Sequence, residues 1–105
     1  MSWVRAAAAA EVAEGEVLGV TVEGTEIALY RIGDRFHATS DICSHAYARL
    51  SDGYFDADDC TIECPIHAAR FAVLTGAALE PPASAPIRVY QVKLEGDDLL
   101  VLLEP

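Results

Sequence analysis

Two short segments of the sequence each carry one cysteine and one histidine. The first is a C-x-H segment with Cys43 and His45, and the second is a C-x-x-H segment with Cys64 and His67. Thiolate sulfur and imidazole nitrogen are ligands by which proteins hold zinc ions and iron–sulfur clusters. Because each spacing lets one loop direct both of its side chains at one centre, the two loops together supply four ligands. The sequence therefore predicts a metal centre with two sulfur and two nitrogen ligands.

Two kinds of metal centre fit this ligand set. Zinc takes two cysteines and two histidines around a single ion, whereas one class of [2Fe-2S] cluster has two cysteines on one iron and two histidines on the other. Zinc modules more often keep like ligands together, as C-x-x-C and H-x3-H. One cysteine and one histidine from each loop suits a cluster that both loops hold. The spacing therefore favours the cluster, and zinc stays open as the alternative.

Short runs of β-forming residues, separated by glycine-containing turns, flank the ligand segments. Before them, three runs predict an antiparallel meander: Val17–Val22, Thr25–Ile32 and residues 36–40. After them, residues 87–94 and Asp98–Leu103 predict a closing hairpin around a turn at residues 95–97. Residues 6–12 suit a helix about as well as a strand end followed by a loop.

The ligands lie in a segment that differs in character from both flanks. Residues 41–76 hold all three cysteines and two of the three histidines. Within this segment, Tyr54-Phe55 and Thr61-Ile62 predict a small hairpin. We therefore expect a single domain over residues 1–105, with a base and an inserted cluster-binding subdomain. The base would consist of residues 1–40 and 77–105, and the subdomain of residues 41–76.

The ligand segments and their surroundings resemble a known family. The matching residues are Cys43-Ser44-His45, Leu50-Ser51-Asp52-Gly53, Glu63-Cys64-Pro65-Ile66-His67, Phe71 and Thr75-Gly76. They resemble the cluster-binding segment of the Rieske-type [2Fe-2S] ferredoxins of bacterial aromatic-ring-hydroxylating dioxygenase systems, and the likeness covers nearly the whole chain. The resemblance implies an all-β Rieske fold, in which an antiparallel β-sandwich base carries a small inserted cluster-binding β subdomain.

The resemblance also implies a function and a role for each ligand. Cys43 and Cys64 would bind one iron of the cluster, and His45 and His67 would bind the other. The protein would carry single electrons from an NAD(P)H-dependent flavin reductase to a terminal ring-hydroxylating oxygenase, and would not itself be an enzyme. A zinc-binding interaction module that uses the same four residues is the alternative from a different functional class.

Two positions of the ligand region depart from the family pattern. The family commonly has glycine and aspartate where this chain has Ala68 and Ala72. Neither residue is a ligand. Ala68 requires a backbone position that tolerates a Cβ, or a slight shift of the loop.

Four further positions distinguish the chain from the high-potential Rieske proteins of respiratory chains. Those proteins have disulfide-forming cysteines where this chain has Ala48 and Ile66. They also have a serine and a tyrosine, at the positions of Ala69 and Phe71, that donate hydrogen bonds to sulfur. Such hydrogen bonds raise the reduction potential because they stabilise the more negative reduced state. Their absence predicts a potential at the low end of the Rieske range, near roughly −150 mV.

Other residues that could do chemistry are expected to have structural roles. We expect Cys60 to fill a small apolar gap and His37 to lie at the surface or at a strand edge. A mononuclear iron site needs two histidines and a carboxylate, and His37 is the one histidine outside the ligand set, so we do not expect the chain to oxygenate a substrate. Proline cannot extend a sheet, so a proline loop should cross the surface, where the family resemblance implies that it covers the cluster. This loop contains Pro81, Pro82 and Pro86.

The composition excludes several classes of function. The 105 residues include 17 acidic and 7 basic side chains, which gives a net charge of −10. This charge argues against nucleic acid, whose binding depends on Lys and Arg, and against anionic membranes. No apolar run approaches the roughly 20 residues of a membrane span, and no secretory signal is recognisable. We expect a monomer in the cytoplasm, where thiols stay reduced. The acidic turn at Asp56, Asp58 and Asp59 suits either a solvated turn or a surface that steers basic partners.

Overall fold

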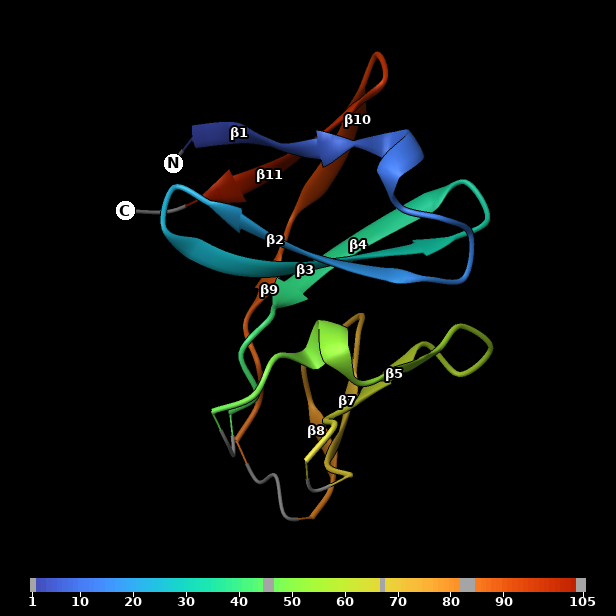
Figure 1. Ribbon diagram of the computed structural model, residues 1–105, viewed down its shortest axis with the longest axis vertical. Helices are drawn as coiled ribbons and strands as arrows, with labels where there is room; N and C mark the ends of the chain where they lie inside the picture. Colours follow the sequence, from blue (N-terminus) through green and yellow to red (C-terminus); the bar gives the residue numbers. More distant parts are fainter. Residues whose placement is uncertain (1, 45–46, 67, 82–84, 104–105) are drawn as a thin grey trace.

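The computed structural model describes residues 2–44, 47–66, 68–81 and 85–103. Within them the chain forms three antiparallel sheets that lie in layers (Figure 1). The first sheet consists of β1 (Ser2–Ala8), β11 (Asp98–Leu103) and β10 (Val92–Glu95). The second consists of β2 (Val17–Val22), β3 (Thr25–Ile32), β4 (Arg35–Ser40) and β9 (Val89–Tyr90). The third and smallest consists of β5 (Tyr54–Asp56), β6 (Thr61–Glu63), β7 (Arg70–Ala72) and β8 (Ala78–Glu80).

The strand β3 separates two apolar cores. Its four central residues, 27–30, are all fully buried. Because successive side chains of a strand point to opposite faces, Ile27 and Leu29 pack into the core between the first two sheets. Ala28 and Tyr30 pack into the second core, which lies against the small sheet. One strand therefore supplies side chains to both the base and the cluster-binding region.

The predicted meander is confirmed. The strands β2 and β3 have the predicted bounds, and β4 begins one residue earlier than predicted, at Arg35. The turn between β2 and β3 contains Glu23 and Gly24, both with positive φ. Two consecutive residues with positive φ are typical of a type I′ turn, whose twist matches that of the two strands it connects. The glycine-containing turns in the sequence therefore located this sheet correctly.

The prediction of one continuous strand over residues 87–94 was wrong. This segment contains two strands that belong to different sheets, since β9 pairs with β4 and β10 pairs with β11. Gln91 separates them, and the chain passes there from the second sheet to the first. An alternating apolar pattern shows that residues are extended, but it does not show with which partner strand they pair.

The N-terminal part of the base contains a strand followed by a short helix. Residues 6–12 combine both interpretations, because β1 continues to Ala8 and the 3-10 helix η1 (Ala9–Glu11) follows. The Ala8 N–H donates a hydrogen bond of 3.0 Å to the Glu11 side chain, which stabilises this turn.

Among the described residues, no helix is long and apolar enough to cross a membrane.

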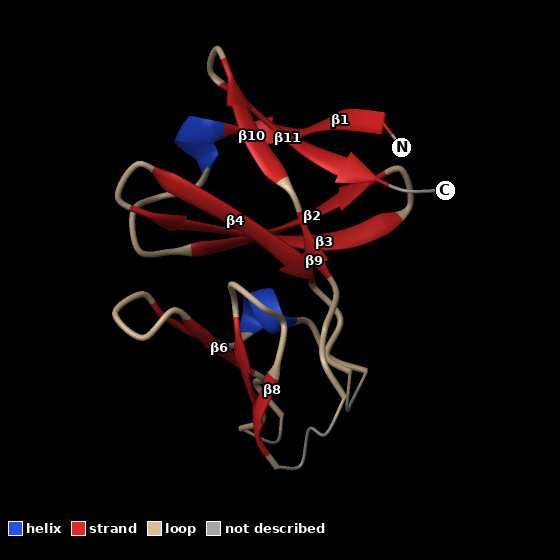
Figure 2. Cartoon of the chain, turned by 180° about the vertical axis from the view of Figure 1, so that it is seen from behind, coloured by secondary structure: helices blue, strands red, loops and turns tan. Residues whose placement is uncertain are grey.

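The small sheet extends the predicted hairpin. The pairing of β5 with β6 confirms that hairpin, and β7 and β8 add two further strands. The 3-10 helix η2 (Leu50–Asp52) lies between the second sheet and the small sheet (Figure 2). The small sheet continues to Glu80, and the division of the chain into residues 1–40, 41–76 and 77–105 stays a prediction.

Candidate metal centre

The first ligand segment forms a loop between β4 and η2. We call residues 42–49 the first ligand loop. An isolated β-bridge between Ile42 and Arg49 closes its base, and the Cys43 N–H donates a hydrogen bond of 2.9 Å to the Ala48 carbonyl oxygen. The Cys43 side chain lies inside the molecule, with 4% of the residue exposed. The predicted ligand His45 lies outside the described residues.

The second ligand segment connects β6 to β7 and repeats this arrangement. We call residues 64–69 the second ligand loop. The Cys64 N–H donates a hydrogen bond of 2.7 Å to the Ala69 carbonyl oxygen, so in both loops the cysteine N–H binds the carbonyl of the fifth residue after it. Cys64 is 1% exposed. The predicted ligand His67 lies outside the described residues.

The two loops bring their cysteines into one apolar environment. Cys43 and Cys64 belong to the same buried cluster, together with Leu50 and Phe71. No disulfide joins the three cysteines of the chain. A buried thiolate is costly unless a positive partner compensates its charge, and metal coordination supplies such a partner. Two buried cysteines from two equivalent loops therefore fit a metal centre held from both sides, although no three potential metal ligands come together among the described residues.

The second ligand loop contains a strained residue. Ala68 has a φ of 56°, in the left-handed region that alanine rarely adopts. Its N–H donates a hydrogen bond of 3.2 Å to the Cys64 carbonyl oxygen. The structure therefore explains why the family commonly has glycine at this position, and it shows that the chain accommodates the Cβ without opening the loop.

A buried carboxylate, Asp41, connects the chain just before the first ligand loop to the helix η2. Asp41 is 1% exposed, and both of its oxygens accept hydrogen bonds from Ser51. The Ser51 N–H lies 2.7 Å from Oδ1, and the Ser51 hydroxyl lies 2.8 Å from Oδ2. Burial raises the pKa of Asp41 above its ordinary value, and the hydrogen bonds from Ser51 oppose this shift. Sequence reasoning did not single out Asp41, because a single aspartate after a strand gives no sign that it will be buried.

The proline loop contacts the first ligand loop. The Ser44 hydroxyl donates a hydrogen bond of 2.7 Å to the Ala85 carbonyl oxygen. Pro81 and Pro86 lie outside the strands and are exposed, as predicted for a surface loop. Pro82 lies outside the described residues. Ser44, which lies between the predicted ligands Cys43 and His45 in the sequence, is thus bonded directly to the proline loop.

Three buried residues of the ligand region have side chains that cannot donate a hydrogen bond. Ala69 and Phe71, which occupy the positions of the serine and tyrosine in high-potential Rieske proteins, are both fully buried. Ala48 is also buried. The low reduction potential stays a prediction, which depends on the lack of donors at these positions.

The two ligand loops border a surface groove of about 710 Å³. Its lining includes Tyr47 from the first loop and Pro65 and Ile66 from the second. Tyr47 is 97% exposed and Ile66 is 56% exposed, so both loops present apolar side chains to solvent. The charged residues of the lining are Glu26, Arg49 and Asp52, and Arg49 forms an ion pair of 2.8 Å with Glu26. The groove thus combines exposed apolar groups with an ion pair and a further carboxylate, next to the predicted ligands.

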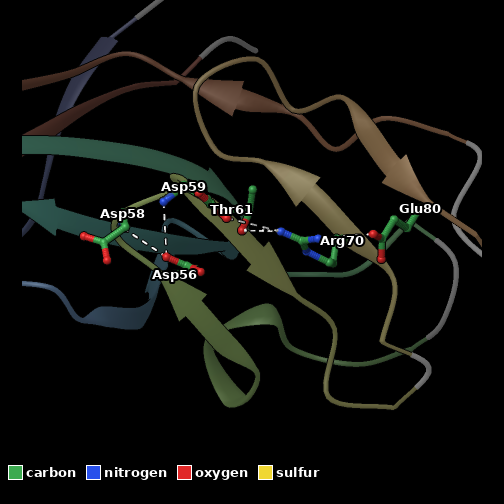
Figure 3. A network of polar contacts seen from close by, with 6 residues as sticks. All are labelled: Asp56, Asp58, Asp59, Thr61, Arg70 and Glu80. Atoms are coloured by element: carbon green, nitrogen blue, oxygen red, sulfur yellow. Dashed lines mark hydrogen bonds and ion pairs between the residues drawn. The ribbon is translucent and has the colours of Figure 1, made fainter.

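The acidic turn between β5 and β6 has a local structural role. Asp56 Oδ1 accepts hydrogen bonds from the N–H groups of Asp58 and Asp59, at 3.0 and 3.1 Å (Figure 3). Arg70 on β7 bonds to Glu80 at 3.1 Å and to Thr61 at 3.3 Å. Local hydrogen bonds at the surface therefore explain why acidic residues occur in this turn. Its role in steering partners stays a prediction.

The residues expected to be structural lie in ordinary packing environments. Cys60 is partly buried against the core that contains Cys43 and Cys64, and burial raises the pKa of its thiol. His37 is partly buried on β4. Burial, and to a smaller extent the charge of Arg35, lower its pKa below the ordinary value.

Comparison with known proteins places this geometry in a family. Residues 2–91 match the Rieske [2Fe-2S] domain. The ferredoxin component of a naphthalene 1,2-dioxygenase system from Pseudomonas aeruginosa is 46% identical over 99 residues, which cover 94% of this chain and 93% of that protein.

Two solved structures are similar over almost their full length. One is the ferredoxin of carbazole 1,9a-dioxygenase from Nocardioides aromaticivorans IC177, with a TM-score of 0.93 and 38% identity over 99% of this chain and 100% of that chain. The other is a complex of reduced oxygenase and oxidized ferredoxin in carbazole 1,9a-dioxygenase, with a TM-score of 0.85 and 37% identity over 94% of this chain and 91% of the matched chain. The chain belongs to the Rieske [2Fe-2S] family, with the predicted all-β fold and a Rieske-type [2Fe-2S] cluster as its cofactor.

Proposed function

We propose that the protein is a one-electron carrier that passes electrons from an NAD(P)H-dependent flavoprotein reductase to a terminal aromatic-ring dioxygenase. The observation that carries this proposal is the pair of equivalent loops, each with a buried cysteine, in a chain that resembles ferredoxin components over almost its full length. The names of those relatives, a ferredoxin and a ferredoxin component of dioxygenase systems, also support a carrier rather than a catalyst.

Four residues hold the cluster in this proposal. Cys43 and Cys64 bind one iron, and His45 and His67 bind the other. When bound, such a cluster accepts and releases one electron at a time. Because both cysteines are buried, water would be excluded from the sulfur side of a bound cluster, and Ala69 and Phe71 have no side-chain group that could donate a hydrogen bond to it. The ligand loops therefore bias the cluster toward a potential near roughly −150 mV.

The groove between the ligand loops is the proposed contact surface for both redox partners. Tyr47 and Ile66 offer exposed apolar area beside the ligands, and the net charge of −10 favours partners with basic surfaces. A terminal oxygenase and a reductase that use one surface would bind in turn. A cytoplasmic location is part of the same proposal, because thiols stay reduced there and remain available as ligands.

The cluster and its ligands are tested on the purified protein. We expect two irons and two sulfides per chain, no zinc, and a rhombic EPR signal with an average g value below that of the free electron after reduction with dithionite. A colourless protein with one zinc ion and no sulfide, also after expression with added iron, would establish the zinc module instead.

The ligand assignment has its own variants. Cys64→Ala should abolish the visible spectrum, whereas Cys60→Ala, which changes a cysteine outside the ligand set, should retain it. A cluster that persists unchanged in Cys64→Ala would refute the assignment. Electron transfer itself is measured by adding the protein to the reductase and oxygenase of a naphthalene dioxygenase system and following substrate-dependent oxidation of NADH.

A further inference from the structure

We propose that the turn at residues 50–53 sets the separation of the two ligand loops, and that Ser51 and Gly53 are positioning residues for the cluster. The turn consists of η2 and Gly53 and contacts the backbone just before each ligand cysteine. The inference rests on the proposed ligands Cys43 and Cys64, and it concerns residues that bind no metal themselves.

Ser51 fixes the turn to the first ligand loop. It donates two hydrogen bonds to Asp41, which lies two residues before Cys43. The Leu50 N–H adds a third bond of 2.7 Å to the Asp41 backbone carbonyl. Because Asp41 is almost completely buried, loss of the Ser51 hydroxyl would leave a carboxylate oxygen with one partner fewer and no access to water.

Gly19 on β2 holds this contact in place from the base. A Cβ at position 19 would overlap the Ser51 hydroxyl and would lie 2.7 Å from Asp41 Oδ2. At Gly19, β2 therefore approaches Ser51 and Asp41 more closely than a residue with a side chain would allow. Ser51 and Asp41 are enclosed between β2 and the turn, which restricts their freedom to separate.

Gly53 fixes the turn to the second ligand loop. A Cβ at position 53 would overlap the backbone carbonyl oxygen of Glu63, the residue directly before Cys64. The φ of Gly53 is −92°, which any residue can adopt, so the glycine is required by space and not by conformation. The Gly53 N–H also donates a bond of 2.9 Å to the Leu50 carbonyl, and Leu50 is fully buried beside both cysteines.

The consequence is a direct mechanical link between the two cysteines. Four consecutive residues contact the chain two residues before Cys43 on one side and one residue before Cys64 on the other. A cluster bridged by both loops needs their separation to be constant, because a small misplacement of a ligand weakens binding and changes the electronic environment. The turn supplies that constancy without touching the metal.

The test uses two variants and two matched controls, all as full-length protein expressed with added iron. Ser51→Ala removes the hydroxyl bond to Asp41. Thr75→Ala removes a hydroxyl that accepts an exposed bond of 3.2 Å from the Ala77 N–H, in the turn between β7 and β8. Gly53→Ala adds the Cβ against Glu63. Gly24→Ala adds one in the turn between β2 and β3, where nothing lies within 4 Å but the positive φ makes alanine strained.

The readouts are the rate of iron release to a chelator and the g values of the reduced cluster. We expect Ser51→Ala to release iron about 3- to 10-fold faster than the unchanged protein, the factor that corresponds to loss of one hydrogen bond, and Thr75→Ala to change the rate less than about 2-fold. We expect Gly53→Ala to shift the g values or to lose the cluster, and Gly24→Ala to keep the original g values despite a lower melting temperature.

The outcomes separate this inference from the proposed function. Iron release in Ser51→Ala equal to that in Thr75→Ala, together with unchanged g values in Gly53→Ala, would overturn the positioning role. Absence of a [2Fe-2S] signal in the unchanged protein would instead overturn the proposed function. If Gly53→Ala fails to fold, the comparison of Ser51→Ala with Thr75→Ala decides alone.

Discussion

Ala68 adopts a backbone conformation that favours glycine, in the middle of the second ligand loop. Its φ of 56° places the Cβ close to the following carbonyl group. The left-handed conformation of alanine destabilises the folded state by about 1–2 kcal/mol. Glycine would not have this strain, but it loses more conformational freedom on folding, which offsets part of the gain. A residue beside the predicted ligand His67 therefore lowers the stability of the native state.

We predict that Ala68→Gly stabilises the protein. The net gain should be about 0.5–1 kcal/mol, which corresponds to a rise of roughly 2–6 °C in the melting temperature of a domain of this size. Ala72→Gly is the matched control, because Ala72 lies in the strand β7, where glycine should destabilise. Thermal unfolding of both variants with the cluster bound measures the difference. A lower melting temperature for Ala68→Gly would contradict the strain argument.

Tyr30 and Thr39 form a buried pair beneath the small sheet. Their hydroxyl groups lie 2.7 Å apart, and the Thr39 hydroxyl also lies 2.9 Å from the Ser40 carbonyl oxygen. The Tyr30 ring packs against Phe55 of β5 at 5.0 Å between centroids. Burial raises the pKa of Tyr30 well above its ordinary value, so the phenol stays protonated and can donate its hydrogen to Thr39.

We predict that Thr39→Val destabilises more than Tyr30→Phe. In Tyr30→Phe, Thr39 keeps the Ser40 carbonyl as a partner, and the cost should be about 1 kcal/mol. In Thr39→Val, the Tyr30 hydroxyl is left buried without that partner, and the cost should be about 2–3 kcal/mol. Urea unfolding of the two variants gives the comparison, and equal losses would show that the hydroxyl pair is not the determining feature.

His37 makes the stability of the folded chain depend on pH. Its pKa is lowered in the folded state by burial and by Arg35, whereas the unfolded value is about 6.5. As the pH falls below neutrality, the unfolded chain takes up this proton before the folded chain does, so the contribution of His37 to stability is lost toward lower pH. His37→Gln should therefore lose less stability than the unchanged protein between about pH 7 and pH 5.5. Parallel pH profiles of the two melting temperatures would refute this.

At the scale of elements, the sequence located strands well where glycine turns separate them. The bounds of β2, β3 and β11 agree with prediction. It failed at β9 and β10, since the passage from one sheet to another depends on distant partner strands. It also did not predict β7 and β8, because these strands have the sequences RFA and ALE and contain few residues that favour a strand.

The site was predictable to the extent that it depends on residue type and spacing. Cys43 and Cys64 lie buried in one cluster as the paired motifs imply, and the roles of His45 and His67 stay predictions. The contacts that support the loops could not be predicted. Gly19 and Ser51, for example, are 32 positions apart in the sequence, and only the folded chain brings them together.

At the scale of the whole molecule, exposed apolar residues lie at both ends. Ile66 lies in the groove between the ligand loops with 56% exposure, and Leu94 lies on β10, in the sheet at the opposite end, with 54% exposure (Figure 1). The two side chains have the same size and similar accessibility, but of the two only Ile66 is next to the predicted ligands. They form a matched pair for testing where partners bind.

We predict that Ile66→Ser weakens partner binding and that Leu94→Ser does not. Loss of the exposed apolar area of Ile66 should raise the KM for this protein about 5-fold in the coupled reaction with reductase and oxygenase. The EPR spectrum of both variants should match that of the unchanged protein. Equal KM values for the two variants would place the partner contact elsewhere.

The expectation of a monomer is tested on the same samples by light scattering during gel filtration.

The strand β3 contributes side chains to both cores, and this ties the fate of the base to that of the cluster. Loss of the cluster would release the ligand loops and weaken the packing on one face of β3, whose opposite face supports the base. Hydrogen exchange of the apoprotein should then be faster at β3 amides than in the holoprotein, whereas unchanged exchange would show that the two cores are independent. Proteases cleave chains that open in this way. The resistance of the polypeptide to proteases would therefore depend on whether the cluster is bound.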